Sequence, residues 1–95
     1  MKEYYGHRSW NAWNVSHWIG NDEPLYKAAV ECIAWARANT SPHRTLRPPD
    51  KIEDVIARRA AFRFHRICMP YGERTPDGAV YNRLAVKLAM LGLMD

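Results

Sequence analysis

The sequence has little cysteine and no long apolar run, and both absences exclude classes of protein. Its two cysteines, Cys32 and Cys68, form no CxxC pair in 95 residues, which argues against a disulfide scaffold and a zinc knuckle. No stretch reaches the roughly 18 consecutive apolar residues of a membrane span, and the N-terminus lacks the apolar segment of a secretory signal. We therefore expect a cytoplasmic protein with two reduced cysteines.

Motifs for catalysis are also missing. There is no Gly-rich phosphate loop, no GxSxG and no HExxH, and the four histidines are scattered along the chain. The adjacent acids Asp22 and Glu23, and Glu53 and Asp54, stand near expected helix starts, where capping explains them. We expect no enzyme activity, no cofactor and no metal site.

The composition is that of an ordinary globular domain. Apolar residues make up 47% and charged residues 25% of the chain, and a chain of this length forms one domain, residues 1–95. Four tryptophans and a formal net charge of +4 are the two unusual features. These features identify no function by themselves.

Helical periodicity predicts four helices, and no strand pattern is visible. The first, over residues 10–19, begins after Ser9 and ends at Gly20. The second, over 23–38, begins at Asp22 and Pro24, with an inward stripe of Leu25, Ala29, Cys32, Ile33 and Ala36. Residues 40–49 contain three prolines and are expected to form a loop.

The third expected helix covers residues 51–68, with Asp50 as its cap and Glu53 completing a capping box. Its expected core stripe is Ile52, Val55, Ile56, Ala60, Phe64 and Ile67. The fourth runs over roughly 76–92 after Thr75, with Val80, Leu84, Leu88 and Leu91 facing inward and Val86 and Met90 beside them. Together they predict an all-α fold, a small bundle or orthogonal array of about four helices.

The first helix is unusual because three tryptophans, Trp10, Trp13 and Trp18, share one broad arc. We expect them to form core, since a helix that is apolar nearly all round is usually buried. The alternative is an aromatic binding platform. Asn14 lies within the arc and must find hydrogen bonds, because an unpaired buried amide costs on the order of 1–3 kcal/mol.

The positive charge is concentrated in the middle of the chain. Residues 37–66 hold eight Lys and Arg against three acids, a local charge of +5, and the rest sums to −1. Arg59, Arg63 and Arg66 share a helix face, with Arg58 and His65 at its flanks, and Arg44 and Arg47 in the loop extend the patch. Such a patch suits phosphates or an acidic protein; the alternative is a solvated helix face.

One string resembles a known group of sequences. The run YYGHRSWNAWNVSHWIGNDEPLY, residues 4–26, resembles small phage, prophage and plasmid proteins with a WNVxxWIxND signature, here residues 13–22, and there is a TPDGxxY echo at residues 75–81. Pro24 stands where that group has Gly. The resemblance implies a mobile-element origin and covers about a quarter of the chain, but it carries no activity and identifies no site.

The leading hypothesis is therefore stoichiometric binding to a host machine, as a defence inhibitor of anti-CRISPR or anti-restriction type in the host cytoplasm. Its expected binding residues are Arg44, Arg47, Arg58, Arg59, Arg63 and Arg66, with Tyr4 or Tyr5 as further contacts. The alternative is a nucleic-acid-binding regulator that uses the basic third helix, although a ten-residue loop is long for a helix-turn-helix. A small assembly factor that pairs as a dimer is a third possibility. The partner and the oligomeric state are left open.

Overall fold

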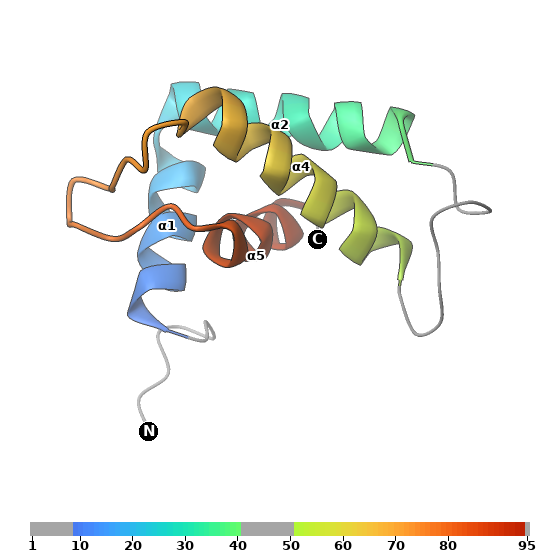
Figure 1. Cartoon of the computed structure of the whole chain (residues 1–95). Helices are drawn as coiled ribbons and strands as arrows, with labels where there is room; N and C mark the ends of the chain where they lie inside the picture. Colours follow the sequence, from blue (N-terminus) through green and yellow to red (C-terminus); the bar gives the residue numbers. More distant parts are fainter. Residues whose placement is uncertain (1–8, 41–50, 95) are drawn as a thin grey trace.

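The structure is a computed structural model that describes residues 9–40 and 51–94. These residues form four helices: α1 (Trp10–Asn21), α2 (Glu23–Ala38), α4 (Ile52–Cys68) and α5 (Arg83–Met94). Figure 1 shows α4 running diagonally and crossing in front of the left end of α2, from which α1 descends, with α5 below α4 in this view. The all-α fold expected from periodicity is confirmed.

The four helices pack as a ring around one core. α4 contacts α2 and α5, and α1 in turn contacts α5 and α2, so every helix has two close neighbours. None of these helices is long and apolar enough to cross a membrane. The outer side of α4 is consequently flanked by α2 on one edge and α5 on the other.

A single residue, Asp22, separates α1 from α2. Its backbone N–H donates to the Trp18 carbonyl at 2.9 Å and closes α1, while its side chain accepts from the Leu25 N–H at 3.2 Å and caps α2. The predicted bounds of the second helix and its inward stripe are confirmed, with Leu25 partly buried. The predicted end of the first helix at Gly20 is wrong, because Gly20 is helical and α1 continues to Asn21.

The core is lined by small residues, which bring the helices close together. Phe64, Ile19 and Met90 are its largest fully buried side chains, and seven helical alanines of α2, α4 and α5 complete it: Ala29, Ala36, Ala57, Ala60, Ala61, Ala85 and Ala89. α1 contributes Ala12, Val15 and Ile19 from the side opposite its tryptophans. The expectation that the tryptophans form core is wrong, because an alanine-lined interior has no room for indole rings; Trp10 is 38% exposed, and Trp13 and Trp18 are partly buried.

α4 presents a buried side and a charged side. Val55, Ile56, Ala60 and Phe64 are buried as predicted, whereas Ile67 is 60% exposed and does not belong to the core. The N-cap is Lys51, which makes no side-chain capping hydrogen bond. The predicted capping box of Asp50 and Glu53 cannot be compared with this helix start, because Asp50 lies outside the described residues.

The predicted helix start at Thr75 is wrong, because residues 75–82 form a turn ahead of α5. Thr75 and Ala79 close it through a backbone N–H to carbonyl bond of 2.9 Å, and Arg74 pairs with Val80 in an isolated antiparallel bridge. Gly78 has φ +95°, a left-handed conformation that glycine adopts without strain and that no helix interior contains.

The helix start that the sequence analysis missed is Asn82. Its side-chain oxygen accepts from the Ala85 N–H at 2.8 Å, so α5 begins at Arg83. Because the start is seven residues later than predicted, the inner face also differs. Ala85, Val86, Ala89 and Met90 are buried, whereas Leu84, which was assigned to the core, is 50% exposed.

A buried polar network ties this turn to α1. The Asn14 side chain, only 2% exposed, accepts from the Thr75 hydroxyl at 2.6 Å and donates to the Asp77 carboxylate at 2.9 Å. The Trp18 indole N–H donates to the same carboxylate oxygen at 2.9 Å. Asn11 adds a reciprocal pair, donating to the Val80 carbonyl at 2.8 Å and accepting from the Val80 N–H at 2.7 Å. Asn14 thus finds the partners its burial requires.

Replacing Asn14 tests how much this network contributes to the stability of the fold. We expect Asn14→Leu to lower the free energy of unfolding by about 1–3 kcal/mol, because the buried Thr75 hydroxyl loses its acceptor. Urea denaturation followed by circular dichroism measures the change. Asn21→Leu, the same substitution at an exposed position of α1, should cost less. Equal losses in the two variants would show that the network adds no stability.

The dependence of stability on pH in acid tests the contribution of the Asp77 carboxylate. Hydrogen bonds from Asn14 and Trp18 hold the pKa of Asp77 below its ordinary value of 3.8. A carboxyl whose folded pKa is lowered stabilises the fold above the unfolded pKa, and that stabilisation is lost as pH falls through the folded pKa. We therefore expect the stability difference between the native chain and Asp77→Asn to be constant above about pH 5 and to shrink below about pH 4. A difference that does not change down to pH 2 would contradict the assignment.

Candidate functional site

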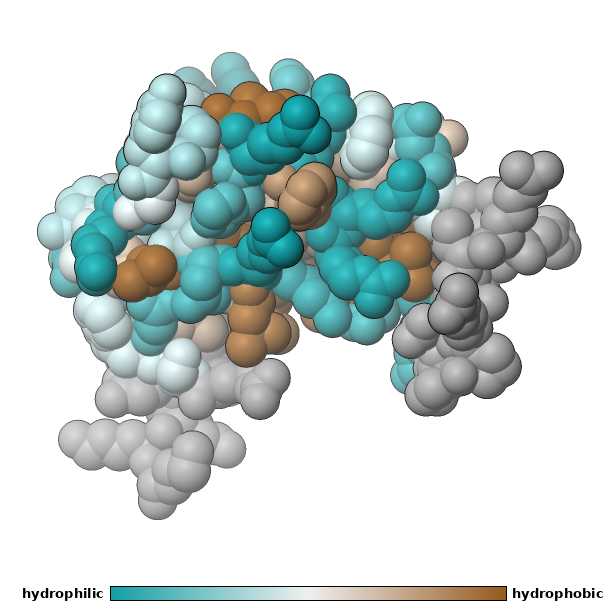
Figure 2. Space-filling model, viewed as in Figure 1, coloured by the Kyte–Doolittle hydropathy of each residue, from teal (hydrophilic) through white to brown (hydrophobic). Residues whose placement is uncertain are grey.

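The exposed side of α4 carries the arginines that the sequence singled out. Arg58 and Arg66 are exposed, and Arg59 and Arg63 are partly buried against α2. Phe62 and Ile67 stand exposed on the same helix. Figure 2 shows this face as mostly hydrophilic with separate hydrophobic side chains among the polar ones. We call Arg58, Arg59, Arg63 and Arg66 the arginine face.

Two of these arginines are held by Trp35 of α2. The Arg63 guanidinium lies over the indole at 4.4 Å from the ring centroid, and that of Arg59 at 5.8 Å. Arg59 also donates to the Asn39 carbonyl at 2.9 Å, and its bond to the Thr40 hydroxyl is 3.4 Å long. Arg59 therefore donates a hydrogen bond to a carbonyl at the C-terminal end of α2, where the helix dipole favours a cation.

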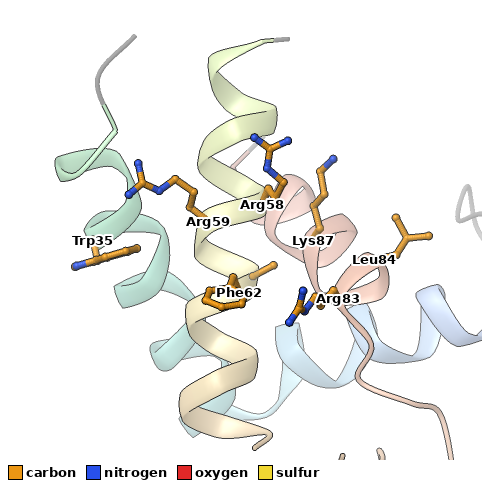
Figure 3. Close-up of a pocket in the computed structure, with 8 residues that line it drawn as sticks. Trp35, Arg58, Arg59, Phe62, Arg83, Leu84 and Lys87 are labelled. Carbon is orange, nitrogen blue, oxygen red and sulfur yellow. The ribbon is translucent and has the colours of Figure 1, made fainter. Parts of the chain in front are cut away.

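A groove of about 650 Å³ runs along the outer side of α4, from Trp35 of α2 to Leu84 of α5. Figure 3 shows Trp35 at one side, Phe62 in the middle and Leu84 at the other side. Four cations line it with these apolar side chains: Arg58, Arg59, Arg83 and Lys87. The Arg83 guanidinium lies over the Phe62 ring at 5.0 Å.

The cations of the groove greatly outnumber its carboxylates. Within 9–40 and 51–94 the ion pairs are Lys87 with Asp54, at 3.1 Å, and Lys27 with Glu23, at 4.0 Å. No described carboxylate lies within ion-pair distance of the arginine face or of Arg83. The charge of this surface is consequently available to an anionic partner.

The structure tests only part of the predicted patch. Arg59, Arg63 and Arg66 lie on one face of α4, as the spacing predicts, and Arg58 stands at its flank on the side of Lys87 (Figure 3). Arg44, Arg47, Tyr4 and Tyr5 lie outside the described residues.

Four residues of this surface were not predicted from the sequence: Trp35, Arg83, Leu84 and Lys87. The i, i+4 spacing of Arg83 and Lys87 was a usable signal, but the misplaced start of α5 hid it. Trp35 had no signal of its own, because only the contact between α2 and α4 brings it beneath Arg63.

The remaining chemistry of the described part is sparse. Cys32 and Cys68 are free thiols, and burial raises the pKa of each, so both stay protonated and weakly nucleophilic at neutral pH. No group of three or more His, Cys, Asp or Glu in this part could hold a metal ion. The groove with its cations is therefore the candidate binding site.

Comparison with known proteins identifies a similarity but no activity. Residues 1–47 are similar to a family of unknown function, DUF7249. The matched segment contains α1 and α2, including Trp35, and ends before α4. No curated protein and no solved structure matches the chain.

A double-mutant cycle measures how firmly Trp35 holds Arg63. We expect Trp35→Leu and Arg63→Met to couple by about 0.5–1 kcal/mol in unfolding free energy, the range of a partly exposed cation–π contact. The control cycle pairs Trp35→Leu with Lys27→Met, eight residues away on the same helix, and should give no coupling. Equal coupling in both cycles would mean that the ring does not hold the guanidinium.

Proposed function

We propose that this protein is a non-catalytic binding protein that docks on an acidic surface of a host protein or nucleoprotein complex through its arginine face. One observation carries the proposal: four arginines on the exposed surface of α4 have no described carboxylate partner, and two of them lie over the Trp35 ring.

The way the arginines are held supports docking. The Arg63 guanidinium over the Trp35 ring keeps its edge N–H groups for a carboxylate or phosphate, and the ring limits the rotamers that binding would otherwise freeze. Trp and Arg are also the residue types most enriched at interaction hot spots. The arginine face therefore loses less conformational entropy on binding than free surface arginines would.

The biological setting is part of the same proposal. The WNVxxWIxND string resembles sequences of phages, prophages and plasmids. A small stoichiometric binder from such a source could inhibit a host defence complex in the host cytoplasm, as an inhibitor of anti-CRISPR or anti-restriction type. Support for this setting comes from the string alone, since the similar family has no stated activity.

A nucleic-acid-binding regulator is the second candidate. The arginine face lies along one exposed helix, which is a suitable shape for contacts to a phosphate backbone. Against it, α2 ends at Ala38 and α4 begins at Ile52, a connection much longer than the three or four residues of a helix-turn-helix.

Charge reversal tests the proposal. We expect the double variant Arg59→Glu, Arg63→Glu to lose capture of the host partner in affinity pull-down while its helical circular dichroism stays intact. The control, Arg37→Glu with Lys51→Glu, makes the same change in net charge at two exposed positions that line no described groove and should still capture it. Capture that survives the first variant would remove the arginine face from the function.

The salt dependence of binding separates the two candidates. Duplex binding through five or six phosphates would show a log-log salt slope near −5. A purified protein that binds duplex DNA or RNA with such a slope, and captures no stoichiometric protein, would establish the regulator in place of the inhibitor.

A further inference from the structure

We infer that the groove along α4 takes an acidic amphipathic peptide segment of the partner, with apolar side chains on Phe62 and Leu84 and carboxylates on the surrounding cations. This inference rests on the proposed function and specifies the chemistry of its partner. Three observations carry it: exposed apolar side chains in the groove, their alternation with cations, and the covering of the aromatic rings by guanidinium groups.

The first observation is apolar surface left in contact with water. Phe62 is 48% and Leu84 is 50% exposed, and both line the groove. They belong to α4 and α5, so the apolar lining spans a helix pair. The volume of the groove, about 650 Å³, is within the range of ligand pockets.

The second observation is the alternation of charge and apolar surface across three helices. From α2 to α5, Trp35, Phe62 and Leu84 supply the apolar positions, and the cations lie among them (Figure 3). Lys87 is already paired with Asp54 at 3.1 Å, so the cations that carboxylates of a peptide would meet are Arg58 and Arg83, which have no described carboxylate partner. A segment whose apolar and acidic side chains alternate matches this pattern.

The third observation separates a peptide from a nucleic acid. Base stacking needs an open ring face, but guanidinium groups already lie over Phe62 and Trp35. The eight lining residues include no amide, hydroxyl or carboxylate side chain that could accept a hydrogen bond from a base edge. Phosphates would satisfy the arginines but leave Phe62 and Leu84 in water.

A peptide titration tests the inference without knowledge of the natural partner. The probe is a synthetic peptide with Phe and Leu alternating with Asp and Glu, and its twin carries Ala in place of both apolar residues. Each is titrated to about 1 mM, where weak binding is still visible, into isotope-labelled full-length protein. Backbone amide shifts of α4 and α5 are followed. An oligothymidylate of about twelve nucleotides, within the usual site size, is the third probe.

We expect the apolar–acidic peptide to bind at the groove and its alanine twin to bind at least about tenfold more weakly. Phe62→Ala and Leu84→Ala should each weaken the first peptide about tenfold without loss of fold, because both side chains are half exposed. Val30→Ala removes a comparably exposed apolar side chain of α2 outside the groove and should not change the affinity. Arg58→Gln with Arg83→Gln should weaken both peptides.

Equal affinity of the two peptides, binding of neither, or tighter binding of the oligothymidylate would each overturn the inference. These outcomes are distinguishable from failure of the proposed function. A host partner that is captured equally by the native chain and by Phe62→Ala, but lost by the double reversal of Arg59 and Arg63, would leave docking on the arginine face in place and remove only the groove.

Discussion

The position of the candidate site depends on one polar contact, the buried Asn14 side chain that joins Thr75 and Asp77. This contact fixes the turn of residues 75–82 on α1, and the turn leads directly to Asn82 and the start of α5. Arg83, Leu84 and Lys87 follow within the first turns of that helix. The start of α5, and with it the edge of the groove at Arg83 and Leu84, therefore follows directly on a turn that the Asn14 amide holds.

The same contact gives the sequence signature a structural meaning. The WNVxxWIxND string supplies Asn14 and Trp18, and the TPDGxxY echo supplies Thr75 and Asp77, so the two strings bind each other. Gly78, with its positive φ, is needed for the turn that the second string forms. These residues build the scaffold, whereas the groove is lined mainly by residues of α4 and α5, beyond the segment similar to DUF7249.

Local signals in the sequence were sufficient where one element determines its own structure. Asp22 and Pro24 define the start of α2, and the apolar period defines its inner face. The arginine face follows from spacing on one helix. Local signals failed where packing between elements determines the structure. The tryptophans of α1 point away from the core because alanines bring the helices too close for indole rings, and α5 starts late because a turn docked on α1 replaces its expected first two turns.

The groove could not be predicted from the sequence for the same reason, and its chemistry depends on the packing that forms it. Trp35, Phe62 and Arg83 come from three helices and meet only in the packed structure. Guanidinium groups over rings are partly desolvated before any partner arrives, so a carboxylate that pairs with them displaces less water than it would at a free arginine. The Trp35 ring thus contributes to anion binding by holding the guanidinium groups of Arg59 and Arg63. A surface of this kind favours partners that bring both charge and apolar area. A partner with charge alone leaves the apolar side chains in water, and a partner with apolar area alone leaves the cations unpaired.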